Sequence, residues 1–277
     1  MTALPPKGRV KLGLVIDLDT CVGCHACAVA CKEWNDGGQF GPLEDHDAYG
    51  AEPDGVWFNR VHSYQVAAQA VPPLVRTVEA AAAAVTAAPS SGGCGAQADT
   101  GMTVHFPRSC LHCETPACVT VCPTGASYKR AEDGIVLVDE ERCIGCQLCA
   151  WACPYGAREF SEHHGTMQKC TLCVDRIYNE RLAPEDRQPA CVKACPTRAR
   201  HFGDLGDPDS AVSQLVAERE GYAPMPELGY EPVNRYLPPR PRRAAPPESA
   251  PAASADDRYD PAALPPLLRW LDRALSR

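Results

Sequence analysis

The stretch CIGCQLCAWACPYGA, residues 143–157, places four cysteines within eleven residues and follows the fourth, Cys153, with a proline. Similar clusters occur three more times, so all but one of the 17 cysteines fall into four groups. In chain order the groups are Cys21, Cys24, Cys27 and Cys31; Cys110, Cys113, Cys118 and Cys122; Cys143, Cys146, Cys149 and Cys153; and Cys170, Cys173, Cys191 and Cys195. Cys94 stands apart from them, and we expect it to be a free thiol that ligates no metal.

An internal repeat carries these groups. GLVIDLDTCVGCHACAVAC (13–31) and GIVLVDEERCIGCQLCAWAC (134–153) share one design, and MTVHFPRSCLHCETPACVTVC (102–122) is a third variant. Each begins with a β-branched run and continues into closely spaced cysteines. The pattern predicts a strand, a metal-binding loop and a short helix that begins near the third cysteine.

Disulfides and zinc explain the cysteines poorly. The first twenty residues contain no apolar export-signal core and no twin arginine, so we expect a reducing compartment, where disulfides are rare. Structural zinc sites use two close cysteine pairs a dozen or more residues apart. The fourth group alone could fit that pattern, whereas four thiols on one tight turn do not.

The spacing C-x2-C-x2-C-x3-C-P of residues 143–154 is that of bacterial ferredoxins, in which the fourth cysteine ligates the neighbouring cluster. Cys122 and Cys195 are also followed by proline, whereas Cys31 is followed by Lys32. Sixteen cysteines at four per cubane predict four [4Fe–4S] clusters. Ligand sharing then joins the groups in pairs. Either the first group pairs with the second and the third with the fourth, or the first pairs with the fourth and the second with the third.

The four groups, including the long gap between Cys173 and Cys191, resemble the iron–sulfur subunits of membrane-bound molybdopterin oxidoreductases. That family includes the electron-transfer subunits of dimethyl sulfoxide reductase, polysulfide reductase and respiratory nitrate reductase. The likeness covers roughly residues 10–205. Within the family, residues 49–64, 195–218 and 225–240 resemble the iron–sulfur subunits of quinone-linked sulfite dehydrogenases.

The resemblance implies the nested pairing of groups and therefore four sets of iron ligands. The first set is Cys21, Cys24, Cys27 and Cys195, and the second set is Cys31, Cys170, Cys173 and Cys191. The third set is Cys110, Cys113, Cys118 and Cys153, and the fourth set is Cys122, Cys143, Cys146 and Cys149. Some relatives lack a cysteine at the Cys118 position and carry a three-iron cluster there. Cys118 is present here, so four cubanes are expected.

The expected fold is α+β, with two ferredoxin-like dicluster modules nested in the chain. Residues 10–35 with 160–205 form the first module and residues 102–159 the second. Residues 36–101 are an insertion that holds a strand at 56–66 and a low-complexity loop. Residues 206–277 supply a helix within 207–221 and an extended Pro-rich docking tail that ends in an amphipathic helical pattern.

The sequence argues against several classes of function. The net charge of −8 argues against nucleic-acid binding, and no run of eighteen apolar residues exists that could span a membrane. No nucleotide-binding or nucleophile motif is present, so the chain is expected to carry electrons without catalysing a reaction alone. Lys32, Lys129, Arg158, Lys169, Lys193 and Arg198 are candidates to offset the cluster charge, and Trp34 and Trp151 to shield clusters from water.

The resemblance implies a role as the electron conduit of a three-part complex. A molybdopterin subunit would oxidise sulfite, and an integral membrane anchor subunit would reduce quinone. The chain is expected on the cytoplasmic face, held peripherally through the anchor. The alternatives are the same conduit in a sulfoxide, polysulfide or thiosulfate reductase, a soluble polyferredoxin for a hydrogenase or formate dehydrogenase, and a zinc-structured scaffold.

Overall fold

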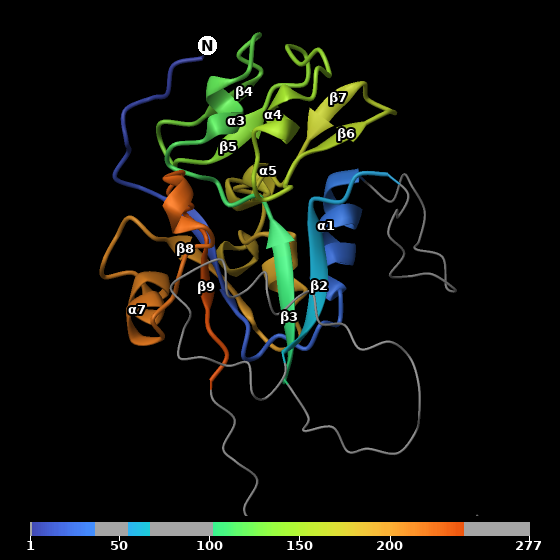
Figure 1. Ribbon diagram of the computed structural model, residues 1–277. Coiled ribbons are helices and arrows are strands. Elements are labelled where there is room, and N and C mark those ends of the chain that lie inside the picture. Colours follow the sequence, from blue (N-terminus) through green and yellow to red (C-terminus); the bar gives the residue numbers. More distant parts are fainter. Residues whose placement is uncertain (1, 37–54, 67–101, 241–277) are drawn as a thin grey trace, which may run out of the picture. The chain divides into compact units, whose positions relative to one another are not determined.

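The computed structural model describes residues 2–36, 55–66 and 102–240 (Figure 1). By its internal contacts the chain divides into Met1–Pro239 and Arg240–Arg277, and the elements below belong to the first unit. Cys94, the low-complexity loop and the C-terminal helical pattern lie outside the described residues. Within the described ranges, no helix has the length and apolar character needed to cross a membrane.

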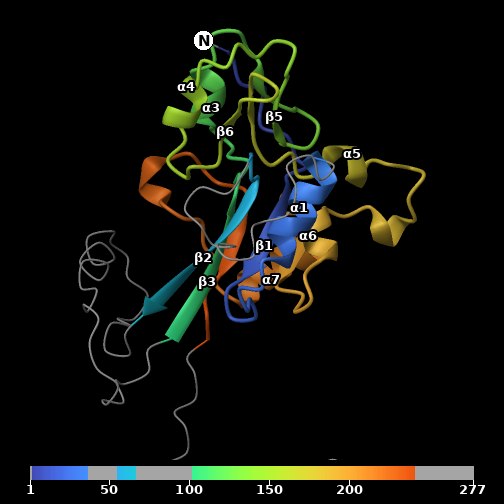
Figure 2. The same cartoon turned by 90° about the vertical axis from the view of Figure 1, so that its right-hand side faces the viewer.

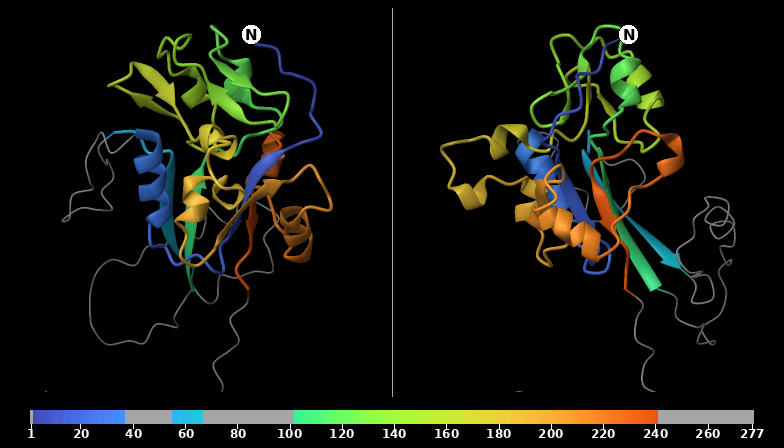
Figure 3. Two further views of the ribbon diagram at one scale, coloured as in Figure 1. Left: turned by 180° about the vertical axis from the view of Figure 1, so that it is seen from behind. Right: turned by 90° about the vertical axis from the view of Figure 1, so that its left-hand side faces the viewer.

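A three-stranded sheet joins the two ends of the described chain. It has the order β8 (Arg200–Asp204), β1 (Leu12–Asp17) and β9 (Arg235–Leu237). Strand β1 pairs antiparallel with β8 and parallel with β9, and Figure 3 shows it between them. Leu14, Val15 and Ile16 are fully buried, which explains why β1 is an unbroken apolar run instead of an alternating one.

The other strands form three two-stranded sheets. Strand β2 (Asn59–Val66) pairs antiparallel with β3 (Met102–Ser109), which confirms the strand predicted within 56–66. Strands β4 (Ser127–Lys129) and β5 (Val136–Val138) form one hairpin, and β6 (Glu159–Ser161) and β7 (Thr166–Gln168) form another. The second hairpin runs across the division expected between residues 159 and 160.

Four helices begin one residue before the third cysteine of a group, as the repeat predicted for the first three groups. They are α1 (Ala26–Asp36), α3 (Ala117–Thr120), α4 (Leu148–Trp151) and α6 (Ala190–Lys193). Helix α5 (Val174–Ile177) and the 3-10 turns η2 (Pro184–Asp186) and η3 (Pro226–Leu228) complete the short elements. Helices α1 and α6 lie side by side, as Figure 2 shows.

Helix α7 (Ala211–Glu218) confirms the helix expected within residues 207–221. The Ser210 hydroxyl caps it by accepting the backbone N–H of Ser213 at 3.2 Å. Val212 is buried and packs with Val15 and Leu237, so α7 covers the three-stranded sheet.

The main core lies between these elements and contains cysteine thiols as well as aliphatic side chains. Leu14, Leu172 and Tyr236 are buried in it together with Cys27 and Cys191. The mixture of short strands and short helices confirms the α+β class. Because the core is built partly from cysteines, whatever the thiols bind contributes directly to the fold.

Candidate iron–sulfur sites

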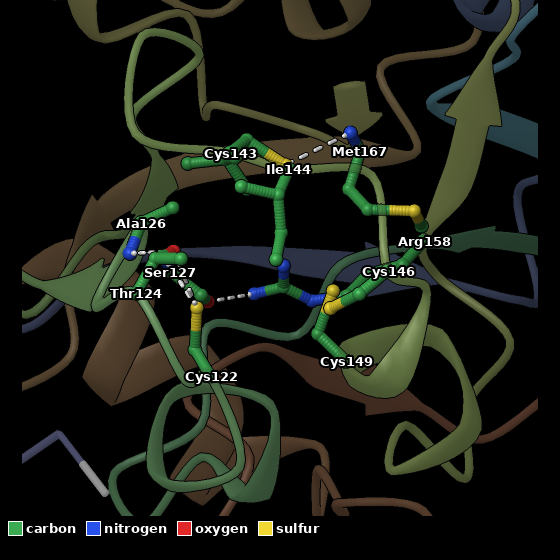
Figure 4. A pocket seen from close by; sticks show the side chains of 11 residues that line it. Cys122, Thr124, Ala126, Ser127, Cys143, Ile144, Cys146, Cys149, Arg158 and Met167 are labelled. Carbon is green, nitrogen blue, oxygen red and sulfur yellow. Dashed lines mark hydrogen bonds between the residues drawn. The ribbon is translucent and has the colours of Figure 1, made fainter. Parts of the chain in front are cut away.

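The four thiols of the fourth set line one pocket (Figure 4). The loop of residues 143–149 supplies three of them and the end of α3 supplies the fourth, Cys122. The backbone N–H of Ser127 donates to Cys122 Sγ at 3.4 Å, and that of Met167 donates to Cys143 Sγ at 3.3 Å. Burial alone would raise the pKa of Cys122, but hydrogen bonds from Ser127 and Thr124 outweigh it and lower the pKa. The surroundings of Cys122 therefore favour its thiolate, which is the form that binds iron.

The four thiols of the first set line a second pocket. Cys21, Cys24 and Cys27 reach it from the first group, and Cys195 reaches it from the fourth group, just after α6. The backbone N–H of Ala199 donates to Cys195 Sγ at 3.2 Å. The pairing of β1 with β8 brings these two segments together, because Ile16 lies opposite Arg200.

The second and third sets are deeper in the protein, and their thiols act on one another. Burial raises the pKa of Cys31 well above its usual value, and the neighbouring thiols Cys170, Cys191 and Cys173 raise it further. Burial raises the pKa of Cys170 to about 12 and that of Cys173 to about 11.

The third set also contains a thiol with a raised pKa. Burial raises the pKa of Cys113, and Cys110, Cys118 and Cys153 add to that rise. In each deep set, then, one thiol has the three others of its own set as electrostatic neighbours. Four thiolates this close together would repel one another, so a bound cation or metal cluster would be needed to stabilise the deprotonated forms.

The donor chemistry suits iron–sulfur clusters. All sixteen thiols of the four sets are free of disulfides. Several sulfurs accept backbone N–H groups, including Cys170 from Leu172 at 3.4 Å and Cys173 from Ala190 at 3.5 Å, and such bonds adjust cluster potentials. Among the described residues, no group of three or more His, Cys, Asp or Glu side chains converges to hold a single metal ion. Cubane ligands bind four separate iron atoms and need not converge.

The buried cations differ from those expected. Lys32, Lys129, Arg158 and Lys169 are buried as expected of charges beside clusters, whereas Lys193 and Arg198 are exposed. Lys193 pairs instead with Asp186 at 2.7 Å.

Arg200 was not among the expected cations, yet it is buried and lines the pocket of the first set. The repeated pattern C-P-x-x-A-R at 153–158 and 195–200 could have found it.

Three further residues lie near the thiols in the sequence. His112 is fully buried, and burial holds its pKa well below the usual range, so it is neutral. Its Nδ1 atom accepts the backbone N–H of Val136 at 3.1 Å. Trp151 is 88% exposed, so the expectation that it shields a cluster within this chain is wrong. Trp34 is partly exposed, and its indole N–H donates to Asp175 at 2.9 Å.

Comparison with known proteins agrees with this chemistry. Residues 102–205, which hold groups two to four, match the 4Fe-4S dicluster domain, and residues 12–33 match a 4Fe-4S binding domain. The chain is 51% identical over 233 residues to a sulfite dehydrogenase subunit of Allochromatium vinosum, covering 84% of this chain and 85% of that protein. It is an iron–sulfur subunit of the dimethyl sulfoxide reductase family. Its role in that family is electron transfer.

More distant relatives place the subunit in the same family. It is 33% identical over 233 residues to a subunit of anaerobic dimethyl sulfoxide reductase from Escherichia coli, covering 83% of the present chain and 89% of that protein. It is 34% identical over 231 residues to a tetrathionate reductase subunit of Salmonella typhimurium, covering 83% of the present chain and 73% of that protein. Both relatives are named as one chain or subunit of a reductase.

Proposed function

We propose that the subunit holds four [4Fe–4S] clusters in the four nested sets and connects a sulfite-oxidising molybdopterin subunit with a quinone-linked membrane anchor subunit. When bound, the clusters supply one-electron exchange. The observation that carries the proposal is that the first and fourth sets each line one pocket completely. The second and third sets support it because their thiols are mutual electrostatic neighbours.

The same interactions support a linear order of the sites. Thiols of adjacent sets influence one another in three places: Cys27 acts on the pKa of Cys191, Cys110 on Cys170, and Cys118 on Cys149. These links connect the first set to the second, the second to the third and the third to the fourth. The first and fourth sets are then the two ends of the conduit, and each includes one exposed thiol, Cys24 and Cys146.

The two modules follow from this arrangement. The first and second sets belong to the first module, and the third and fourth sets to the second. Because Met167 on β7 lines the pocket of the fourth set, we place the division between the modules after the β6–β7 hairpin instead of before it.

The end at the fourth set offers an apolar contact surface. Ile144, Leu148 and Trp151 are exposed there, and residues 143–157 contain no charged side chain before Arg158. We name these three residues the apolar rim. An uncharged apolar rim beside a terminal site suits an equally apolar partner, so we assign it to the membrane anchor subunit. The molybdopterin subunit then docks at the first set.

Sulfite is proposed as the substrate of the catalytic partner because of the 51% identity to the sulfite dehydrogenase subunit of Allochromatium vinosum. The present subunit would be held peripherally on the cytoplasmic face by the anchor. The 33% identity to the dimethyl sulfoxide reductase subunit of Escherichia coli supports a second candidate, a reductase that uses the same conduit in the opposite direction.

Anaerobic purification of the native complex tests the proposal. We expect a molybdopterin subunit and a membrane subunit to co-purify, with iron and acid-labile sulfide for four cubanes, and sulfite to drive quinone reduction. Oxidation of a quinol by a sulfoxide or polysulfide without activity on sulfite would favour the second candidate. Zinc in place of iron, or a brown protein without a molybdenum partner, would refute the proposal. Protease added to intact spheroplasts should leave the subunit uncut if it faces the cytoplasm.

A further inference from the structure

Two arginines stand at the same position of two repeated motifs. Arg158 ends CPYGAR, residues 153–158, and Arg200 ends CPTRAR, residues 195–200. Their exposed fractions are 6% and 4%. Arg158 directly precedes β6, and Arg200 is the first residue of β8. The backbone therefore fixes where each guanidinium group can reach.

Arg158 lies between the third and fourth sets. Its Nη2 atom donates to Cys118 Sγ of the third set at 3.1 Å and to Ser127 Oγ at 2.7 Å. It also lines the pocket of the fourth set, together with Cys146 and Cys149 (Figure 4). Its guanidinium group also interacts with Cys149, a ligand of the fourth set.

Arg200 lies between the first and second sets in the same way. It lines the pocket of the first set, and one nitrogen donates to Asn59 Oδ1 at 2.7 Å. Its guanidinium group also interacts with Cys191, in the second set. Cys191 of the second set and Cys27 of the first are both electrostatic neighbours of Arg200.

Neither arginine has a carboxylate partner among the described residues, and their remaining contacts are incomplete. Nε and Nη1 of Arg158 and Nη1 of Arg200 have no hydrogen-bond partner there. A buried cation without a counter-charge is strongly unfavourable, so it indicates an anionic neighbour. The cysteine side chains of the four sets are the anionic neighbours that act on both guanidinium groups, so each arginine faces the ligands of two neighbouring sites.

We propose that Arg158 and Arg200 are positioning residues that set the reduction potentials of the clusters, each acting on the two sites of its own module. This inference rests on the proposed function. A one-electron reduction at these sites adds one negative charge and transfers no proton, and both arginines keep their charge. A fixed buried cation therefore favours the reduced form. Ser127 and Asn59 orient the two guanidinium groups.

The test is an EPR-monitored redox titration of the full complex with Arg158→Met and Arg200→Met. In R158M we expect the reduction potentials of the two clusters of the second module to fall by at least about 59 mV. This shift is equivalent to a tenfold change in the ratio of reduced to oxidised form. The two clusters of the first module should not move. R200M should give the reverse pattern, and R158K and R200K should give smaller shifts than the Met variants.

Two exposed arginines are matched controls because each lies close to a ligand. Arg142 precedes Cys143 directly, and Arg198 lies three residues after Cys195. R142M and R198M remove the same charge from solvent-exposed positions, where water screens it. Neither should move any of the four potentials.

The outcomes separate this inference from the proposed function. A wild-type complex with fewer than four clusters would contradict the proposed function. Four wild-type clusters with unchanged potentials in R158M and R200M would overturn the inference alone. If R158M loses iron, R158Q retains a donor for Ser127 and removes the same charge. Loss of clusters in both would show that Arg158 is required for assembly and would also overturn the inference.

Discussion

The Nη2 atom of Arg158 donates to the Ser127 hydroxyl at 2.7 Å, and the two residues occupy equivalent positions, each five residues after a cysteine that precedes proline. The second module thus joins its two halves through one hydrogen bond between matching positions. Ser127 is 2% exposed, so water cannot replace its contribution.

Ser127→Ala should therefore destabilise the second module. The variant leaves a buried guanidinium group with one partner fewer, which costs about 1–3 kcal/mol. We expect the visible absorbance of the clusters to be lost at a lower temperature than in the wild-type protein. An unchanged transition would mean that Ser127 does not hold Arg158.

Asn234 should be among the most sensitive polar residues in the core. It is fully buried, its Oδ1 atom accepts the backbone N–H of Leu14 at 2.8 Å, and its Nδ2 atom donates to the Cys110 carbonyl at 3.0 Å. Asn234→Ala leaves both backbone groups unpaired, and we expect a loss of about 2–5 kcal/mol. Urea titration of the absorbance measures it.

The matched control is Asn179→Ala. The Asn179 side chain accepts one exposed backbone N–H, from Arg181 at 3.0 Å. Its removal should shift the urea midpoint far less than Asn234→Ala does. Equal shifts in the two variants would contradict a structural role for Asn234.

Gly23 should be irreplaceable for the first set. Its φ is +69°, and an added Cβ would lie 2.4 Å from Nδ1 of His105, a ring held by Ser63 at 2.8 Å. Gly23→Ala must therefore displace His105 or the loop between Cys21 and Cys24. We expect the iron content to fall by about a quarter, since one cubane of four is affected.

Gly229→Ala controls for backbone strain alone. Gly229 has nearly the same φ, +67°, and no atom within 4 Å of an added Cβ. It should retain full iron content. If both variants lost the same amount of iron, the contact with His105 would not be the cause.

The apolar rim predicts a defect in assembly. Trp151→Asp places a charge at the centre of the proposed contact with the anchor, and a buried interface tryptophan typically contributes about 2 kcal/mol or more. We expect the variant to keep its clusters and to dissociate from the membrane fraction. Leu228→Asp, at another exposed apolar position on η3, should stay bound. Release by L228D but not W151D would contradict the assignment.

Local features of this fold were predictable from the sequence because they depend on neighbouring residues. The helices at the repeated cysteine groups, the strand containing Asn59 and the helix capped by Ser210 all follow from short patterns. The family could also be identified, since ligand spacing reflects cluster geometry directly.

Long-range features were harder to predict. The spacing of cysteines left two pairings of the groups open, because ligand sharing requires only that two groups meet. Arg200 was missed, and Lys193 and Arg198 were overvalued, since proximity in sequence to a cysteine does not reveal the side on which a side chain lies. The exposure of Trp151 likewise depends on which face of α4 the fold leaves uncovered.

The nested sharing of ligands is the central claim, and the iron content of two double variants tests it most directly. Cys195→Ser and Cys21→Ser remove ligands of the same set, so the double variant should lose one cluster and keep about three-quarters of its iron. Cys195→Ser with Cys143→Ser affects two sets and should keep about half. The opposite result would contradict this account: three-quarters of the iron kept by the Cys195→Ser, Cys143→Ser variant and half kept by the Cys195→Ser, Cys21→Ser variant. Group one would then share ligands with group two, and group three with group four.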